Sequence, residues 1–140
     1  MFLLDVNVVV ALHRPDHVHH AAVRTWQEQF AAPFTVPAVV WHGFLRIVTS
    51  RRIFDEPSSR EQAFEFVAAV KARPDHLETA PGVRHVEILR RICDEADVAG
   101  PLVSDGVVAA LAVECGARVV TLDRDFARFA SVEHLRPPGC

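Results

Sequence analysis

Cysteine is scarce in this 140-residue chain, and long apolar runs are absent. The cysteines, Cys93, Cys115 and Cys140, are odd in number, widely spaced and without a CxxC pair. This pattern fits neither a disulfide framework nor a zinc cage, and it suits a reducing compartment. No apolar stretch is long enough to span a membrane, and no basic region precedes the apolar N-terminus as it would in a signal peptide. We therefore expect a cytoplasmic protein with no membrane partner.

A strong excess of either charge is also lacking, because 15 Lys and Arg stand against 18 Asp and Glu, for a formal net charge of −3. This balance does not indicate a broad nucleic-acid-binding surface, but it is compatible with a nuclease that has a local basic patch. Half of the residues are hydrophobic and 24% are charged, as in ordinary globular domains. Without repeats or linkers, a chain of this length predicts a single domain over residues 1–140.

Strand patterns and helix patterns alternate along the chain. Apolar runs predict a buried strand over about residues 2–10 and shorter strands at "PFTVP" (33–37), "RVVTL" (118–122) and the edge segment "SVEHLRP" (131–137), with "HLETA" (76–80) as a further candidate. Helical spacing of apolar residues predicts helices over 16–30, 38–50, 58–72, 82–96 and 104–116. Because parallel strands need long crossovers, this alternation predicts an α/β fold with a mainly parallel sheet covered on both faces.

Several of these helices carry signals at their ends. We expect Asp16 to cap the first helix, and Ser58 with Glu61 forms a capping-box pattern at the start of another. Gly116 is a natural C-terminal stop. The apolar side of Ala63–Val70 is a candidate contact surface for a partner, provided that it is exposed.

Acidic residues gather where the predicted strands end. Asp5 lies inside the first apolar run, where a carboxylate costs on the order of several kcal/mol unless it is paired, hydrogen-bonded or bound to a metal. Asp123 and Asp125 follow a predicted strand, on one side of an extended segment, and Asp105 begins the 104–116 helix. Each has an ordinary alternative, as a helix cap, an arginine partner or a turn residue. Together, at the carboxyl edge of a parallel sheet, they predict a site for a hard divalent cation, Mg²⁺ or Mn²⁺.

The motifs that hold these acids resemble a known family. "LLDVNVVVAL" near the start, "SDGVVAALA" later and "VVTLDRDFARF" near the end look like the motifs of PIN-domain proteins, in the same order. They are most similar to the VapC-type toxins of bacterial toxin–antitoxin pairs. "LHRPDHVHHAA" and "GFLRIVTSRRIF" resemble a VapC subgroup that is abundant in mycobacteria. The resemblance implies a three-layer α/β/α sandwich.

It also implies an activity, a cofactor and partners. Proteins of this kind are Mg²⁺-dependent endoribonucleases, with Mn²⁺ as a possible substitute, that inhibit translation and growth. They usually form homodimers and are silenced by a cognate VapB-like antitoxin. By resemblance, Asp5 is the first acid of the site and Asp105 completes the main metal site, while Asp123 and Asp125 act through water or a transient second ion. Asn7 corresponds to a polar residue that orients Asp5 or its water.

One position departs from the family pattern. Many PIN domains place a glutamate before "L-x-R" in the second helix, whereas "GFLR" puts Gly43 at about that position here. The alternative function is therefore a catalytically weakened PIN-fold module that binds RNA or protein. A second alternative is a phosphatase-like enzyme with Asp5 as nucleophile, which usually needs an acid two residues later, where this chain has Asn7.

The remaining polar features have two interpretations each. Arg46, Arg51 and Arg124 are candidates for binding RNA phosphates, as are neighbouring arginines, and the alternative is ordinary surface solubility and ion pairing. The "HVHH" segment, residues 17–20, is either a transition-metal site or a solvated helix face, and its spacing favours the solvated face.

Overall fold

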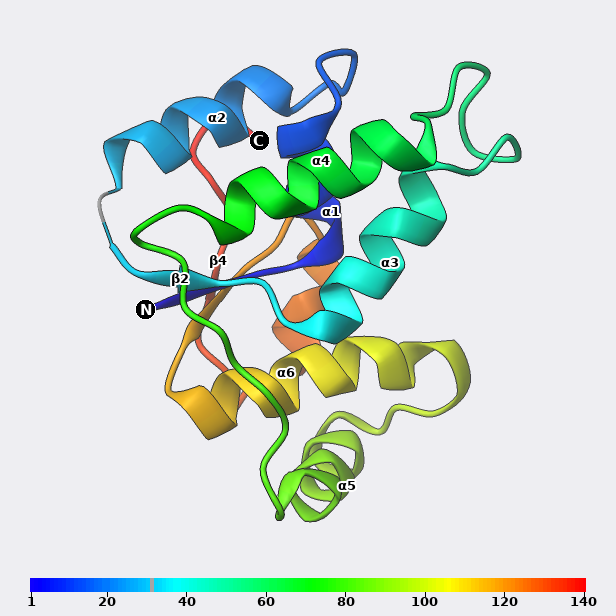
Figure 1. Ribbon diagram of the computed structural model, residues 1–140. Coiled ribbons are helices and arrows are strands. Elements are labelled where there is room, and N and C mark those ends of the chain that lie inside the picture. The colour runs from blue at the N-terminus through cyan, green and yellow to red at the C-terminus, as the bar shows by residue number, and fades with distance from the viewer. Residues whose placement is uncertain (31) are drawn as a thin grey trace.

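The computed structural model describes residues 1–30 and 32–140, and four parallel strands form its centre (Figure 1). The elements follow the order β1 (Phe2–Leu4), α1 (Val6–His13), α2 (His20–Gln29), β2 (Phe34–Thr35), α3 (Ala38–Val48), α4 (Arg60–Lys71), α5 (His85–Ala96), η1 (Gly100–Leu102), α6 (Val103–Cys115), β3 (Arg118–Val120), η2 (Arg124–Arg128) and β4 (His134–Leu135). The sheet order is β2-β1-β3-β4, and every neighbouring pair is parallel.

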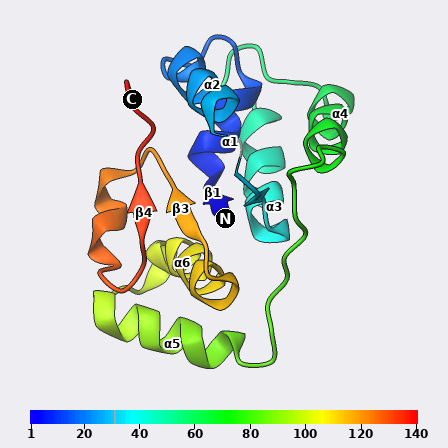
Figure 2. The ribbon, with the colours of Figure 1, turned by 90° about the vertical axis from the view of Figure 1, so that its left-hand side faces the viewer.

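The helices cover both faces of the sheet. Helix α1 contacts α2 and α3, and α3 contacts α4, so these four make one layer. On the opposite face, α6 packs against β3 and α5 packs against α6. Figures 1 and 2 show α5 and α6 below the sheet and α1, α2 and α4 above it. The predicted α/β/α sandwich with a parallel sheet is confirmed.

The strand order defines where a site is expected. After β1 the chain adds β2 on one side, and it later returns to place β3 on the other side of β1. The order therefore switches between β1 and β3, whose register pairs Leu4 with Val120. In parallel sheets ligands bind beside such a switch, outside the carboxyl ends of the strands.

The predicted strand over residues 2–10 is wrong beyond Leu4. The backbone leaves the sheet at Asp5, and α1 follows with Val8, Val9 and Val10 buried. A helix that is buried on most sides gives a continuous apolar run, which periodicity alone does not distinguish from a buried strand. Asp5 is the N-cap of this helix, which confirms the helix-cap role given as its alternative in the sequence analysis.

Other boundaries moved for local reasons. Helix α2 begins at His20, and Asp16 does not cap it because its carboxylate pairs with Arg14. The capping box of α4 uses Ser59 and Gln62, one residue later than predicted, since the adjacent serines fit the same motif. Within the described residues, 76–80 form no strand, only an isolated bridge from His76 to Phe34.

The end of α6 and the exposed side of α4 were also predicted from the sequence. The predicted stop at Gly116 is confirmed, with a left-handed φ of 63° at the C-cap. The stretch Ala63–Val70 is not one exposed apolar face, because Ala63 and Val70 are buried and Phe64 alone of its large apolar side chains is exposed. Among the described helices, none combines the length and apolar character needed to cross a membrane.

Candidate functional site

Asp5 lies where β1 ends and β3 ends beside it. Its residue is only 7% exposed, yet both carboxylate oxygens accept hydrogen bonds. Oδ1 accepts from the backbone N–H of Val6 at 2.7 Å. Oδ2 accepts from the Thr121 hydroxyl at 2.7 Å and from Asn7 Nδ2 at 2.9 Å. Burial is therefore compensated by three donors, which hold the carboxylate in one orientation.

Thr121 is a site residue that the sequence interpretation missed. It is buried, and its hydroxyl donates to Asp5 while accepting from Asn7 Nδ2 at 3.1 Å and from the backbone N–H of Asp123 at 3.0 Å. Two incoming donors direct its single proton toward Asp5. The available signal was its place immediately after β3, opposite the residue that follows β1.

Asn7 joins the two strand ends from the first turn of α1. Its amide Nδ2 donates to Asp5 and Thr121, and its Oδ1 accepts from the backbone N–H of Leu122 at 3.0 Å. The contact with Asp5 is the one that an orienting role requires. Because Asn7 links both chain segments, it also fixes the spacing between the β1–α1 turn and the segment after β3.

Asp105 enters the same region from the first turn of α6. It is half-buried, and within the described residues its carboxylate accepts no hydrogen bond from the protein. Burial, together with the carboxylates of Asp5 and Asp123, raises the pKa of Asp105, and the positive charge of Arg128 opposes this effect only partly. The pKa of Asp5 is also raised, first by burial, with the Asp123 carboxylate contributing, against the lowering effect of its hydrogen bonds.

The structure therefore brings Asp5, Asp105 and Asp123 into one electrostatic group and leaves Asp125 outside it. Asp123 caps η2, and its Oδ1 accepts the backbone N–H of Asp125 at 2.8 Å. Asp125 instead faces Arg128, with Nη2 and Oδ2 3.6 Å apart and 78% of its side chain exposed. The expectation that the two acids share one side of an extended segment is wrong, because the chain turns into a 3₁₀ helix after Asp123.

The oxygen donors of these three acids suit a hard metal ion, although they are not arranged as a closed cage. Over residues 1–30 and 32–140, no three Asp, Glu, His or Cys side chains form a ready-made cage around a metal. The three acids nevertheless repel one another, and no donor among the described residues stabilises the charge of Asp105. Such oxygens fit a hard divalent cation that neutralises them and completes its coordination with water, as Mg²⁺ commonly does.

Position 43 supplies no acid and has a packing reason for its glycine. A Cβ built on Gly43 would lie 2.9 Å from Val6 Cγ2, closer than real side chains approach. Helix α3 therefore passes directly against the first residue of α1, beside Asp5. No acidic residue occurs anywhere in α3.

The predicted RNA-binding arginines are all exposed. Arg46 is in α3, Arg51 follows α3, and Arg124 begins η2, and none lies within ion-pair distance of a carboxylate among the described residues. In the "HVHH" segment, His20 Nδ1 bonds to the Ala11 carbonyl oxygen, and no metal-binding group forms there within the part of the chain described.

Comparison with known proteins identifies the family and supports the fold. The family model described as "PIN domain" matches residues 2–132, a range that includes Asp5, Asp105 and Asp123. Ribonuclease VapC25 of Mycobacterium tuberculosis is 58% identical over 141 residues, covering 99% of both chains. VapC ribonuclease Mb2897 of Mycobacterium bovis is 38% identical, over 98% of this chain and 95% of its own.

Solved structures share the fold at low sequence identity. The crystal structure of Mycobacterium tuberculosis VapC20, titled a sarcin-ricin loop cleaving toxin, has a TM-score of 0.74 at 14% identity, over 98% of this chain and all of its own. The structure of VapBC-1 from nontypeable Haemophilus influenzae has a TM-score of 0.70 at 13% identity, over 96% of each chain.

Proposed function

The chain belongs to the PIN-domain family, among its VapC ribonucleases, and from this premise we propose that it is a metal-dependent endoribonuclease. It would act as the toxin of a type II toxin–antitoxin pair, hydrolysing RNA phosphodiester bonds and so inhibiting translation and growth. The observation that carries the proposal is the convergence of Asp5, Asp105 and Asp123 at the β1–β3 switch point.

The cofactor that fits this site is Mg²⁺, with Mn²⁺ as a substitute. Asp5 and Asp105 would hold the ion directly, and Asp123 would act through water, while Asp125 belongs to the rim as the partner of Arg128. When bound, such an ion supplies an activated water and neutralises charge on the phosphate.

The protein residues have separate tasks in this account. Thr121 and Asn7 orient the Asp5 carboxylate through their hydrogen bonds, as outer residues do around metal ligands. Asp105 accepts no hydrogen bond from the described residues, so its oxygens stay available. Asp123 has Oδ2 free of protein hydrogen bonds within the described residues, and this oxygen can position a water molecule. In the reaction, a water oxygen bonds to phosphorus as the P–O ester bond breaks, and the departing oxygen takes up a proton.

The proposed partners are RNA, a VapB-like antitoxin and a second copy of the chain in a homodimer. The antitoxin is supported by structural neighbours titled as VapBC complexes, from Haemophilus influenzae and Rickettsia felis. The proposed location is the cytoplasm, where RNA and antitoxin are both present.

The other candidate is the catalytically weakened binding module, favoured by the absence of an acid from α3. A phosphatase that uses Asp5 as nucleophile is less suitable, because both Asp5 oxygens already accept hydrogen bonds and position 7 is Asn.

An induction experiment separates these functions. The chain and its Asp105→Asn variant are expressed briefly at equal levels, and new 5′ ends are mapped in total RNA. The nuclease predicts discrete ends with the parent only. A binding module predicts identical RNA end profiles for the two proteins.

A further inference from the structure

Ion pairing is distributed unevenly over the basic residues. Of 15 Lys and Arg, nine lie within 4.0 Å of a carboxylate: Arg14, Arg24, Lys71, Arg73, Arg84, Arg90, Arg91, Arg118 and Arg128. Among those left without such a partner in the described residues, Arg136 donates to the backbone carbonyls of Leu122 and Cys140. Four of the others, Arg46, Arg51, Arg52 and Arg60, come from one continuous stretch of the chain, and all four are exposed.

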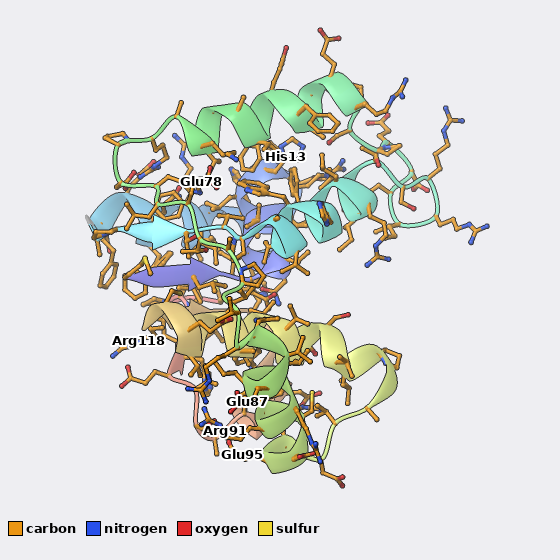
Figure 3. The ribbon with its side chains drawn as sticks, turned by 60° about the horizontal axis from the view of Figure 1, so that its bottom comes forward. His13, Glu78, Glu87, Arg91, Glu95 and Arg118 are labelled. Atoms are coloured by element: carbon orange, nitrogen blue, oxygen red, sulfur yellow. The ribbon has the colours of Figure 1, made fainter. Side chains whose placement is uncertain are left out.

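Helix α5 shows the opposite arrangement. Arg84 pairs with Glu87, and Arg91 lies 3.8 Å from Glu95 along the same helix. Figure 3 shows Glu87, Arg91 and Glu95 together on α5. Cations on that helix are thus matched locally by acids, whereas the four arginines of 46–60 have no carboxylate within 4.0 Å among the described residues.

The loop between α3 and α4 is held by side chains from α1 and from the turn that follows it. The Arg14 guanidinium stacks 4.0 Å from the centre of the Phe54 ring and donates to the Glu56 carbonyl at 2.8 Å. A two-bond fork to Asp16, at 2.9 and 2.7 Å, holds Arg14 in turn. The loop therefore presents its arginines from an ordered backbone, which reduces the entropy cost of binding.

A second anchor holds the end of the loop. His13 Nε2 lies 2.8 Å from Ser58 Oγ, and the Ser58 N–H donates to the Val48 carbonyl at 2.8 Å. His13 lies beneath α4 (Figure 3). The capping box of Ser59 and Gln62 then starts α4 directly, so the loop is fixed at both ends.

This surface is continuous with the acidic group. Gly43 packs against Val6, the residue after Asp5, and Arg46 is three residues farther along α3 on the same side of the helix. Thr49 is six positions after Gly43, which corresponds to roughly 9 Å along a helix. Figure 1 shows α3 running from the sheet toward the loop that precedes α4.

Two exposed acids, Asp55 and Glu56, lie in the same stretch as these arginines, and Asp55 lines a hollow with two of them. Arg51, Asp55 and Arg60 line the same open hollow of about 760 Å³ between the loop and the start of α4. Asp55 lowers the attraction for an anion there, so the surface is a set of separate arginine contacts rather than a uniform basic patch.

We propose that Arg46, Arg51, Arg52 and Arg60, here called the arginine surface, bind phosphates of the RNA strand on one side of the bond to be cut. The inference rests on the proposed function, and the occupant is chosen by charge complementarity and by continuity with the acidic group. Phosphate contacts of this kind position a strand without reading its bases. An acidic protein segment is the competing occupant.

The test measures binding without cleavage. The full chain with Asp105→Asn is titrated into a 5′-fluorescein-labelled single-stranded RNA 20-mer of mixed sequence, and Kd is followed by anisotropy from 50 to 300 mM KCl. The Arg51→Gln/Arg52→Gln pair is compared with the matched Arg90→Gln/Arg91→Gln pair on α5. Asp55→Asn is a third variant.

We expect the first pair to weaken binding about tenfold and to reduce the slope of log Kd against log salt by about 1.4, because each neutralised phosphate of a single strand accounts for about 0.7 of that slope. The α5 pair should leave the slope unchanged, and Asp55→Asn should tighten binding. Equal effects of the two pairs, or no effect of the first, would overturn the proposal. The proposal would also be overturned if the Arg51→Gln/Arg52→Gln variant bound RNA normally but bound a co-expressed antitoxin more weakly than the parent does.

Cleavage by the parent chain is assayed separately, so the two proposals fail in different ways. If the parent cuts no RNA but the arginine effects hold, the nuclease proposal fails and the surface stands. If the parent cuts RNA and the arginine variants bind normally, the surface is wrong.

Discussion

Thr121 donates its hydroxyl proton to Asp5 Oδ2 at 2.7 Å, across the junction where β1 and β3 end. This contact joins residues 116 positions apart in the chain and is buried on both sides. It lowers the pKa of the Asp5 carboxyl against the raising effect of burial, and so helps keep a buried carboxylate ionised. The same hydroxyl accepts the N–H of Asp123, which couples the positions of the two acids.

Thr121→Val should therefore impair catalysis more than folding. The substitution keeps the shape but leaves Asn7 Nδ2 and the Asp123 N–H without this acceptor, so we expect the cleavage rate to fall about 10- to 100-fold. The free energy of unfolding should fall by about 1–3 kcal/mol. Thr35→Val, on β2, is the matched control. Thr35 is also buried, and its hydroxyl lies 2.7 Å from the hydroxyl of Thr79. An equal fall in rate in both variants would argue against a role for Thr121 at the site.

The metal-free protein should become more stable when Asp105 loses its charge. Its pKa is raised in the folded state, so the folded protein binds the proton more tightly than the unfolded chain does. The free energy of unfolding then falls as pH rises from about 4, the unfolded pKa, through the raised folded pKa. Asp105→Asn should unfold at a higher temperature than the parent at pH 7 in EDTA, with the difference vanishing toward pH 4. A parent that is more stable than Asp105→Asn at pH 7 without metal would contradict this.

The acids should contribute unequally to the cleavage rate. Asp5→Ala and Asp105→Ala should lower the cleavage rate by about a hundredfold or more, since each removes a proposed metal ligand. Asp125→Ala should be the mildest substitution, because its exposed side chain faces Arg128 rather than the other acids. Rates and Mn²⁺ affinities by calorimetry are the measurements. A fall in rate in Asp125→Ala as large as in Asp105→Ala would place Asp125 inside the site.

Substitution at Gly43 should destabilise the chain rather than improve it. Any Cβ there meets the stiff, β-branched side chain of Val6 at 2.9 Å, so Gly43→Ala should lower the free energy of unfolding by about 1–3 kcal/mol despite its better helix propensity. A glutamate at position 43 would tighten metal binding if the side chain could point at the acids. Because the Cβ meets Val6 instead, Gly43→Glu should not raise the affinity for Mn²⁺. Adding Val6→Ala should recover much of the stability that Gly43→Ala removes, as measured by urea unfolding. Additive destabilisation in that double variant would show that the contact with Val6 is not the cause.

The layers of the fold were predictable because the helix and strand patterns alternate and each has its own period. The error over residues 2–10 arose where this distinction fails, since α1 is buried on most sides and carries no polar stripe. Asp5 was recognisable as a charge in an apolar run, and its role as the cap of α1 explains why the chain changes structure there.

The partners of Asp5 were harder to predict. Thr121 belongs to an ordinary strand sequence, and only the parallel register of β1 and β3 places it against Asp5. Asp125 was grouped with Asp123 because an extended chain places alternate residues on one side, but η2 turns it toward Arg128. These relations depend on strand register and on a short 3₁₀ helix, which leave little periodic signal in a sequence.

Purified protein incubated with total RNA across a Mg²⁺ titration, beside Asp105→Asn, tests the central claim most directly. If Asp5, Asp105 and Asp123 form a metal-dependent ribonuclease site, the parent generates discrete RNA ends whose yield rises with Mg²⁺, and excess EDTA or Asp105→Asn abolishes them. Cleavage at the same bonds, at the same rate, in excess EDTA or by Asp105→Asn would contradict it.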